Sequence, residues 1–529
     1  MTELHIADQL VILAYFLFVI VIGVMVARRT KDGEDLFLAG RSLTWGFIGL
    51  SMFASNISST TIIGLAGAAY DVGIPDSVYE WGSAIPFIAL ALIYIPLYLR
   101  SRITTVPEFL ERRFDRRSRL IFSALTIVVS IVVDTAGGLY AGALVLQIFF
   151  PGLGLWETCI GLALFAGIYT AFGGLRAVVY TDAVQAVILI AGCGLLTWLM
   201  LDAVGFDWSG VKAQVEALRG PEHMSLVRPA GDERLPWPGL IIPVPFLGFW
   251  YMATNQYITQ RILGARSIND ARWGVMLAGL LKFLPYFIMI VPGIIAISLF
   301  ADQPLDTGDQ VIPFVINEVL PVGIRGLVLA GLISAIMSSV DSTLNSASTL
   351  IVMDFIKTDT RDVSPKQAAT YGKISTFVLM VVAAVWAPNI ANFGGLWSYL
   401  QQMFGIFVPP VVILFILGVF DKRGNGDGAF WTLVLGIAGG IALFALSNFT
   451  DAVDLQFTYR IGIMLVVSAA LFMAISRMTP APRPEVIAPY TYSADLIAAD
   501  TQGLPWYKDY RTHCVGLAVL LVWSYVALW

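Results

Sequence analysis

Two stretches decide the fold of this chain: Ser51-Met-Phe-Ala-Ser-Asn-Ile-Ser-Ser-Thr-Thr-Ile-Ile-Gly64 and Phe249-Trp-Tyr-Met-Ala-Thr-Asn-Gln-Tyr-Ile-Thr-Gln-Arg261. Each belongs to an apolar run of membrane-spanning length, yet each carries polar side chains in its middle. Both contain the pattern Ala-(Ser/Thr)-Asn, and the second lies five apolar runs after the first. Two inverted five-helix repeats, each opening with an interrupted helix, produce this pattern and place free backbone carbonyls at the membrane midplane. Hydrogen bonding between helices is the alternative, but it explains one such cluster better than two at equivalent positions.

The composition places the chain among membrane proteins. Of its 529 residues, 57% are hydrophobic and 13% are charged, whereas soluble proteins carry about 25% charged residues. The net charge is −5 and no basic run indicates nucleic-acid binding. The three cysteines lie far apart, so their spacing predicts neither a metal site nor a disulfide framework.

Fourteen apolar runs have the length of a membrane-spanning helix, which needs about 20 residues. Lys and Arg collect in alternate loops, such as 28–44 and 100–119, and such loops are cytoplasmic. The exception is loop 204–237, which is long and also acidic and so carries little weight in this rule. The pattern predicts that both termini lie outside. The first run lacks a basic leader and a cleavage site, so we expect a retained helix.

Several motifs occur in order along the chain, and together they resemble the sodium/solute symporter family, in its sodium–glucose and sodium–galactose cotransporter branch. They are Glu34-Asp35-Leu-Phe-Leu-Ala-Gly-Arg-Ser-Leu-Thr-Trp45, Ala54-Ser-Asn-Ile57, Tyr79-Glu-Trp-Gly-Ser83, Val106-Pro-Glu-Phe-Leu-Glu-Arg-Arg-Phe114, Gly173-Gly-Leu-Arg-Ala-Val-Val-Tyr-Thr-Asp182, Asn255-Gln-Tyr-Ile-Thr-Gln-Arg261, Ser338-Ser339 with Leu344-Asn-Ser-Ala-Ser348, and Tyr399-Leu-Gln401.

The resemblance implies an all-α polytopic membrane protein with 14 transmembrane helices. Its core would be a LeuT-type five-plus-five inverted repeat, with one extra helix before it and three after it. The expected parts are the extra helix and cytoplasmic loop (1–44), the first repeat (45–203), the outer loop (204–237), the second repeat (238–420) and three C-terminal helices (421–529).

The resemblance also implies a sodium site between the first broken helix and a facing core helix. Its ligands would be the backbone carbonyls of Ala54, Ile57 and Ala335 and the hydroxyls of Ser338 and Ser339. A hard cation prefers several oxygen ligands. Ala335, Ser338 and Ser339 have the spacing i, i+3, i+4, so they share one helix face. Helix packing is the alternative role for the two serines.

For the substrate, the resemblance implies contacts from Glu80, Ser83, Asn255, Lys282 and Gln401, and a gate at Tyr257 that closes the site from the cytoplasmic side. Lys282 lies in the middle of an apolar span. A lone charge there costs about 2.5–3.5 kcal/mol on insertion scales, so its ammonium should face a cavity or a partner. Glu80 has a simpler alternative role at a helix start, and Tyr257 has one in interface packing.

Three positions depart from the family pattern. Thr61 stands where the galactose carrier has a longer amide, so the exact sugar stays open. Asp134 is an intramembrane carboxylate, either functional or buried and protonated. Asp341 replaces a hydroxyl of a second sodium site known in some members. Asp182, Ser338, Asp341 and Ser342 could therefore form a second cation site, unless Asp341 pairs with an arginine.

The sequence therefore predicts a sodium-driven symporter of a small neutral polyol, foremost a monosaccharide, with one or two sodium ions per substrate. Inositol, a carboxylate such as sialic acid, or an amino acid are alternative substrates, and proton coupling is a variant. The chain has no phosphate-loop, zinc-protease or nucleophile-elbow motif, so we expect neither an enzyme nor a channel. Its expected partners are the solute, sodium and the lipid bilayer, without nucleic acid, in the plasma membrane and specifically a bacterial inner membrane.

Overall fold

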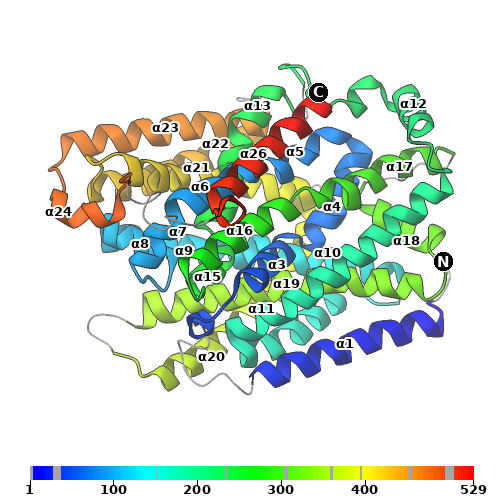
Figure 1. Ribbon diagram of the computed structural model, residues 1–529, viewed down its shortest axis with the longest axis horizontal. Helices are drawn as coiled ribbons and strands as arrows, with labels where there is room; N and C mark the ends of the chain where they lie inside the picture. The colour runs from blue at the N-terminus through cyan, green and yellow to red at the C-terminus, as the bar shows by residue number, and fades with distance from the viewer. Residues whose placement is uncertain are drawn as a thin grey trace.

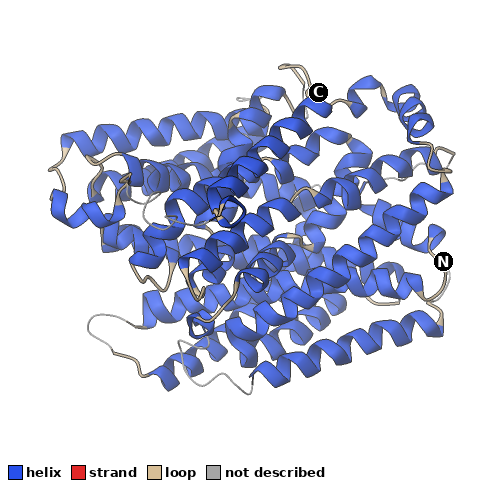
Figure 2. Ribbon diagram, viewed as in Figure 1, coloured by secondary structure: helices blue, strands red, loops and turns tan. Residues whose placement is uncertain are grey.

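The structure is a computed structural model that describes residues 4–27, 37–149, 152–232, 235–302, 305, 308–357, 362–393, 396–450, 455–494 and 505–528. Within these ranges the regular secondary structure is helical (Figure 2). In the described part of the chain, a single backbone β-bridge pairs Leu43 with Ala265. An all-helical chain satisfies its backbone polar groups internally, as a lipid environment requires.

The helices run mostly along the long axis of the molecule (Figure 1). In chain order the principal ones are α1 (Ile6–Ala27), α3 (Trp45–Asn56), α4 (Ser59–Asp71), α5 (Ser77–Trp81), α6 (Ala84–Ala89), α7 (Ile95–Arg100), α8 (Val106–Arg113), α9 (Arg116–Val128), α10 (Ala136–Phe149), α11 (Leu155–Ala203), α12 (Trp208–Arg219), α13 (Trp237–Ile241), α14 (Pro243–Phe249), α15 (Gln256–Leu263), α16 (Ile268–Leu281), α17 (Val291–Leu299), α18 (Val311–Val319), α19 (Ile324–Leu350), α20 (Pro365–Trp386), α21 (Leu396–Phe420), α22 (Gly426–Phe449), α23 (Phe457–Met478), α24 (Pro484–Ile487) and α26 (Tyr510–Ala527).

Nine helical runs in the described ranges are long and apolar enough to cross a membrane. The bent pair Trp45–Asn56 and Thr60–Asp71 makes a tenth if it counts as one span. Ile6–Phe18 and Leu155–Phe165 are shorter apolar helices. The chain is thus a polytopic membrane protein, while the count of fourteen stays a prediction. The counts differ partly because residues 238–260, one of the fourteen apolar runs, are divided among the short segments α13, α14 and η6 (Trp250–Thr254) in the structure.

α11 (Leu155–Ala203) is a continuous helical run. It contains two of the fourteen predicted spans, at about 155–172 and 179–203, which are joined by helical backbone in the structure. No proline lies in this stretch, and proline is the residue that most strongly breaks a helix.

The first broken helix is interrupted where the sequence predicts it. α3 ends at Asn56, and Ile57 has non-helical backbone angles (φ −83°, ψ 82°). Ser58 then caps α4, accepting a hydrogen bond from the Thr61 backbone N–H at 3.2 Å. Serine is favoured at this position because its hydroxyl satisfies a free N–H of the first turn. The two halves are bent by 56°.

The second broken helix is interrupted at Asn255. A π-helical segment, η6 (Trp250–Thr254), follows α14, and Asn255 is extended (φ −73°, ψ 127°). The Asn255 side chain then caps α15 by accepting a hydrogen bond from the Tyr257 N–H at 3.3 Å. π-Helical segments occur often at functional sites. Both predicted interruptions are confirmed.

α19 is the central helix, and 94% of its most apolar 18-residue stretch is buried inside the bundle. Its first turn is fixed by α1, because Asp8 Oδ1 accepts hydrogen bonds from the backbone N–H groups of Gly323 (2.7 Å) and Gly326 (2.8 Å). Gly326 is required there, since an added Cβ would lie 2.6 Å from the Asp8 Cα. The helix that carries Ser338 and Ser339 is thereby held at its start.

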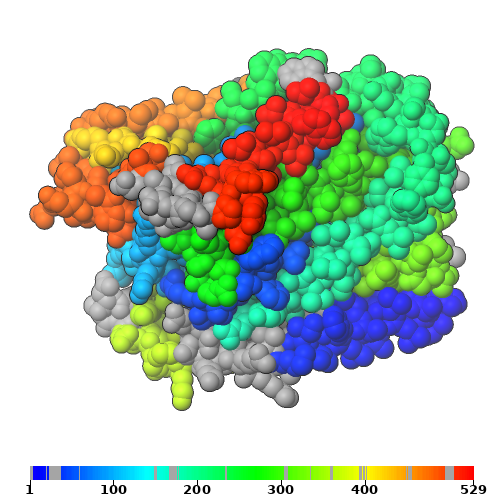
Figure 3. Space-filling model, viewed as in Figure 1, coloured from blue at the N-terminus to red at the C-terminus, as the bar shows by residue number. Residues whose placement is uncertain are grey.

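The outer surface is apolar, as expected for contact with lipid. α26, red in Figure 3, lies across the outside of the bundle, where Val515 and Trp523 are 63% and 64% exposed. A soluble monomer rarely exposes large contiguous apolar surfaces. At the end of α26, Leu528 accepts a hydrogen bond from Leu226 N in the predicted outer loop at 3.0 Å.

Candidate substrate and cation site

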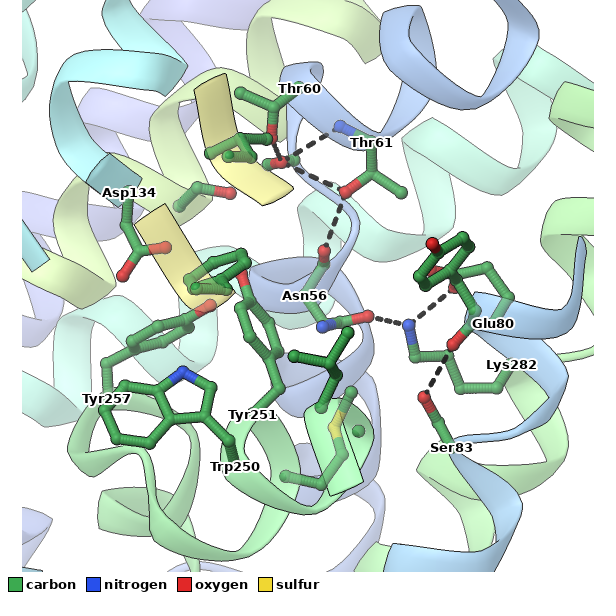
Figure 4. Close-up of a pocket in the computed structure, with 18 of the residues that line it drawn as sticks. Asn56, Thr60, Thr61, Glu80, Ser83, Asp134, Trp250, Tyr251, Tyr257 and Lys282 are labelled. Carbon is green, nitrogen blue, oxygen red and sulfur yellow. Dashed lines mark hydrogen bonds and ion pairs between the residues drawn. The ribbon is translucent and has the colours of Figure 1, made fainter. Parts of the chain in front are cut away.

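A cavity of about 110 Å³ lies between the two broken helices. Its walls come from both of the predicted repeats, and Figure 4 shows most of its side chains. The lining includes Asn56, Ser58, Thr60, Thr61, Tyr79, Glu80, Ser83, Asp134, Trp250, Tyr251, Tyr257, Lys282, Ser339, Thr343 and Phe404. Hydroxyl, amide and aromatic groups predominate. Such a lining suits a small polar molecule that can both stack on rings and form hydrogen bonds.

Lys282 is the one basic residue among the described residues that line the cavity. It follows the last residue of α16, and its side chain is 2% exposed. Its Nζ lies 2.5 Å from Glu80 Oε2 and also donates a hydrogen bond to Asn56 Oδ1. Figure 4 shows these three groups on one side of the cavity. The ammonium therefore has a partner, as the cost of a lone intramembrane charge requires.

Aromatic rings and a carboxylate form the opposite side of the cavity (Figure 4). Tyr257 is 1% exposed, and its ring meets that of Tyr251 edge to face, with centroids 5.7 Å apart. Asp134 lies in another π-helical segment, η4 (Val129–Thr135). Its Oδ2 is buried and has no hydrogen-bond partner within the described structure. That oxygen is therefore available to a bound molecule.

The predicted sodium ligands lie beside this cavity. Ala54 is in the last turn of α3, where helix carbonyls lack an intrahelical partner. The Ser339 hydroxyl lies 3.3 Å from the Ser55 carbonyl and 3.0 Å from the Ala335 carbonyl, and Ser339 also lines the cavity. Oxygen atoms from α3 and α19 thus converge at the break, and oxygen is the ligand type that a hard cation prefers.

A second polar cluster lies next to the first, and Arg261 is at its centre. Arg261 Nη2 is 2.9 Å from Asp182 Oδ2 and 2.5 Å from the hydroxyls of both Ser55 and Ser342. Arg261 Nε is 2.7 Å from the Ser51 hydroxyl. The side chains of Arg261 and Asp182 are 1% and 0% exposed. The guanidinium therefore joins α3, α11, α15 and α19 inside the bundle.

Comparison with known proteins agrees with this architecture. The model of the sodium:solute symporter family matches residues 36–436. The chain belongs to the sodium:solute symporter family. It is 33% identical to sodium/glucose cotransporter 4 of Danio rerio, over 91% of this chain and 80% of that protein. It is 34% identical to sodium/myo-inositol cotransporter 2 of Mus musculus, over 92% of this chain and 79% of that protein.

Solved structures of LeuT-type transporters share the fold of this symporter. An outward-open, substrate-bound Na⁺-coupled sialic acid symporter superposes with a TM-score of 0.79 at 24% identity, covering 90% of this chain and 99% of that one. Mhp1, a nucleobase-cation-symport-1 family transporter in a closed conformation, gives 0.56 at 14% identity, covering 87% and 98%. At these identities the likeness concerns the fold alone. The protein is a sodium-coupled solute symporter rather than an enzyme.

The structure brings most of the predicted substrate residues of the symporter to one cavity. Glu80, Ser83, Lys282 and Thr61 line it, as does the predicted gate Tyr257. Asn255 does not line it; its side chain is buried and caps α15. The Gln401 side chain and the Glu34-Asp35 pair lie outside the described residues.

The predicted cation residues fall into two groups. Ser339 faces the break in the first helix, whereas the Ser338 hydroxyl donates to Asp182 Oδ1 at 2.7 Å. Asp182 and Ser342, predicted for a second sodium ion, contact Arg261. Asp341 is fully buried on the same helix.

The sequence analysis assigned no role to two residues of these clusters. Asn56 was visible only as part of Ala54-Ser55-Asn56, and its contact with Lys282 joins residues 226 positions apart. Arg261 directly follows the apolar run 238–260, where an arginine is expected to face the cytoplasm, and nothing local indicates that its side chain reaches Asp182.

Proposed function

We propose that this symporter transports a small neutral polyol, a monosaccharide or an inositol, together with sodium by alternating access. The observation that supports this best is the charge balance of the cavity. Its one described basic group, Lys282, already pairs with Glu80 and Asn56. A substrate carboxylate would find no second cation among the described lining residues.

Asp134 adds to this argument. An ionised carboxylate repels an anionic substrate, and a protonated one donates a hydrogen bond to a hydroxyl. Neither form supplies a positive charge. A polyol, in contrast, can accept from Lys282 and donate to Glu80 and Asp134 while its ring packs against Tyr257 or Trp250.

The cavity measures about 110 Å³, less than the cavity of about 150 Å³ that holds benzene. A ring that carries several hydroxyls is larger than benzene, so its binding would require the walls to move apart during the transport cycle. Tyr257 would close the cytoplasmic side, and the oxygens of Ala54, Ile57, Ala335, Ser338 and Ser339 would bind the coupled sodium ion. Relatives named for glucose and for myo-inositol transport support both kinds of neutral substrate.

Uptake into proteoliposomes tests the proposal. Labelled glucose, galactose, myo-inositol, sialic acid and a set of amino acids are compared with sodium or choline outside. We expect saturable, sodium-dependent uptake of at least one neutral polyol. Sodium-dependent uptake confined to sialic acid or to amino acids would contradict it.

A further inference from the structure

We propose that the cavity also accepts amino derivatives of the polyol, an amino sugar or an aminocyclitol, and that Asp134 binds their ammonium group. The inference deepens the proposed function and rests on it. Hydroxyls of the substrate would meet Lys282 and Glu80 on one side of the cavity, and the amino group would lie on the opposite side. Asp134 would thereby gain a positively charged partner, which a neutral polyol does not supply.

The charges of the described lining residues do not balance. The lining includes two carboxyl groups, those of Glu80 and Asp134, and one ammonium, that of Lys282. Lys282 Nζ lies 2.5 Å from Glu80 Oε2 and also contacts Asn56, so this ammonium is already partnered. Asp134 is left without a counter-ion among the described lining residues. A carboxylate inside a membrane protein is costly unless a positive group accompanies it, and an ammonium on the substrate is such a group.

The Asp134 carboxyl also has a free acceptor atom. Its Oδ2 is buried and forms no hydrogen bond within the described structure, although an ionised carboxylate can accept several. An ammonium carries three N–H donors and no acceptor, so it matches this oxygen in both charge and polarity. Hydrogen bonds between charged groups are about twice as strong as those between neutral ones. An ammonium should therefore bind here more tightly than a hydroxyl.

Aromatic rings line the same side of the cavity. The ring of Tyr251 meets those of Tyr257 and Phe404 edge to face, with centroids 5.7 Å and 6.1 Å apart. Figure 4 shows Tyr251, Tyr257 and Trp250 on the side of Asp134. The face of an aromatic ring attracts a cation, and sets of such rings recognise ammonium groups in other proteins. The rings therefore add to the preference for a positive charge at this end.

Trp250 extends the match to the group beside the ammonium. Its Nε1 is buried and has no hydrogen-bond partner in the described part of the chain, and Trp250 lines the same cavity. An indole N–H only donates, so it needs an acceptor such as a hydroxyl oxygen. An amino alcohol supplies both groups on neighbouring carbon atoms. Amino sugars and aminocyclitols contain this arrangement, whereas a simple alkylamine does not.

Competition in proteoliposomes measures the preference. Sodium-dependent uptake of a labelled neutral polyol is inhibited by the same polyol unlabelled and by its amino derivative: glucose with glucosamine, galactose with galactosamine, or myo-inositol with an amino-inositol. The assay is run at pH 6.5, where an amine whose pKa is near that of an α-amino group, about 7.7–8.0, is mostly protonated. We expect the amino derivative to inhibit at about tenfold lower concentration. Uptake of the labelled amino derivative is measured in parallel.

Three variants assign the preference to particular groups, and the ratio of the two inhibitory concentrations is compared within each variant. Asp134→Asn keeps the shape of the side chain but removes the charge, so the two inhibitors should become about equally effective. Phe404→Leu removes one ring and should reduce the preference about threefold. Asp427→Asn removes an exposed carboxylate that pairs with Arg117 and does not line the cavity, and it should keep the tenfold ratio.

The outcomes are distinct. If wild type carries the neutral polyol and the amino derivative competes no better, the inference is overturned whether or not any variant folds, and the proposed function stands. A folded Asp134→Asn that keeps the tenfold ratio overturns the role of Asp134. Sodium-dependent uptake of amino derivatives alone overturns the neutral substrate and supports the inference. Sodium-dependent uptake of neither kind of solute overturns both.

Discussion

Lys282 Nζ lies 2.5 Å from Glu80 Oε2, and these side chains are 2% and 10% exposed. The two residues are 202 positions apart in the chain, one in each of the two predicted repeats. Their ion pair closes one side of the cavity. Each charge makes the burial of the other tolerable, because a buried pair that loses one partner leaves an uncompensated charge.

We expect Lys282→Ala to weaken substrate binding strongly and to destabilise the protein, since breaking a buried pair costs about 3–5 kcal/mol. The double variant Glu80→Gln/Lys282→Gln leaves no unpaired charge. It should recover much of the thermal stability in detergent but not the substrate affinity.

Gln401→Ala should weaken substrate affinity less than Lys282→Ala, because a neutral hydrogen bond contributes about 1 kcal/mol. Unchanged substrate affinity in Lys282→Ala, in the double variant and in Gln401→Ala would show that the substrate binds elsewhere.

Ser339→Ala should abolish sodium-dependent uptake while leaving a folded protein. The change deletes a hydroxyl that lies between the Ala335 and Ser55 carbonyls at the helix break. Ser348→Ala is the matched control, because the Ser348 hydroxyl donates a hydrogen bond to the Asn345 carbonyl of its own helix. The measurement is uptake against sodium concentration. Wild-type sodium activation in Ser339→Ala would place the ion elsewhere.

Asp134→Asn should relax discrimination against anionic solutes. The change keeps the shape of the side chain but removes a carboxylate that faces the cavity. We expect sialic acid to compete with the polyol about tenfold better than in wild type, since removing one repulsive charge in a partly screened site is worth about 1–2 kcal/mol. An unaltered competition curve would mean that Asp134 does not set substrate charge.

Asp8→Ala should lower stability by about 1–2 kcal/mol, the usual cost of losing a helix cap. Asp8 Oδ1 holds two N–H groups at the start of α19. Asp8→Asn keeps an acceptor oxygen and should lose less. Thermal unfolding in detergent compares the three proteins, and equal unfolding temperatures would show that α19 does not depend on this contact.

The outer loop should loosen in acid. Burial, with Arg228 and Arg219 nearby, lowers the pKa of His223 from 6.5 to about 4, and its Nε2 lies 3.2 Å from the Tyr70 carbonyl. The folded loop favours the neutral ring, so its packing is fully stable above pH 6.5 and weakens as the pH falls towards 4. The hydrogen-exchange protection factors of residues 221–228, which allow for the slower intrinsic exchange in acid, should fall between pH 7.5 and pH 5. His223→Gln should flatten this dependence, and an identical fall in that variant would exclude His223 as the cause.

The sequence was sufficient for the class of protein and for the two broken helices. These follow from local chemistry. An apolar run with Asn and Ser in its middle cannot stay a regular lipid-facing helix, and Ser58 and Asn255 are natural caps for the helices that restart after them. The substrate residues were expected from the family resemblance, and chemistry supports one of them directly, because a lysine in mid-span such as Lys282 must have a cavity or a partner.

Tertiary structure decided which polar groups meet. Asn255 was expected to bind substrate, and in the folded chain its side chain caps α15. Asp182 was a candidate ligand of a second sodium ion, and it lies 2.9 Å from Arg261, 79 positions later in the chain. Periodicity places a side chain on a helix face, but it does not determine which helix packs against that face or how far an arginine reaches. Those contacts depend on the packing of the two repeats against each other, which only the folded chain defines.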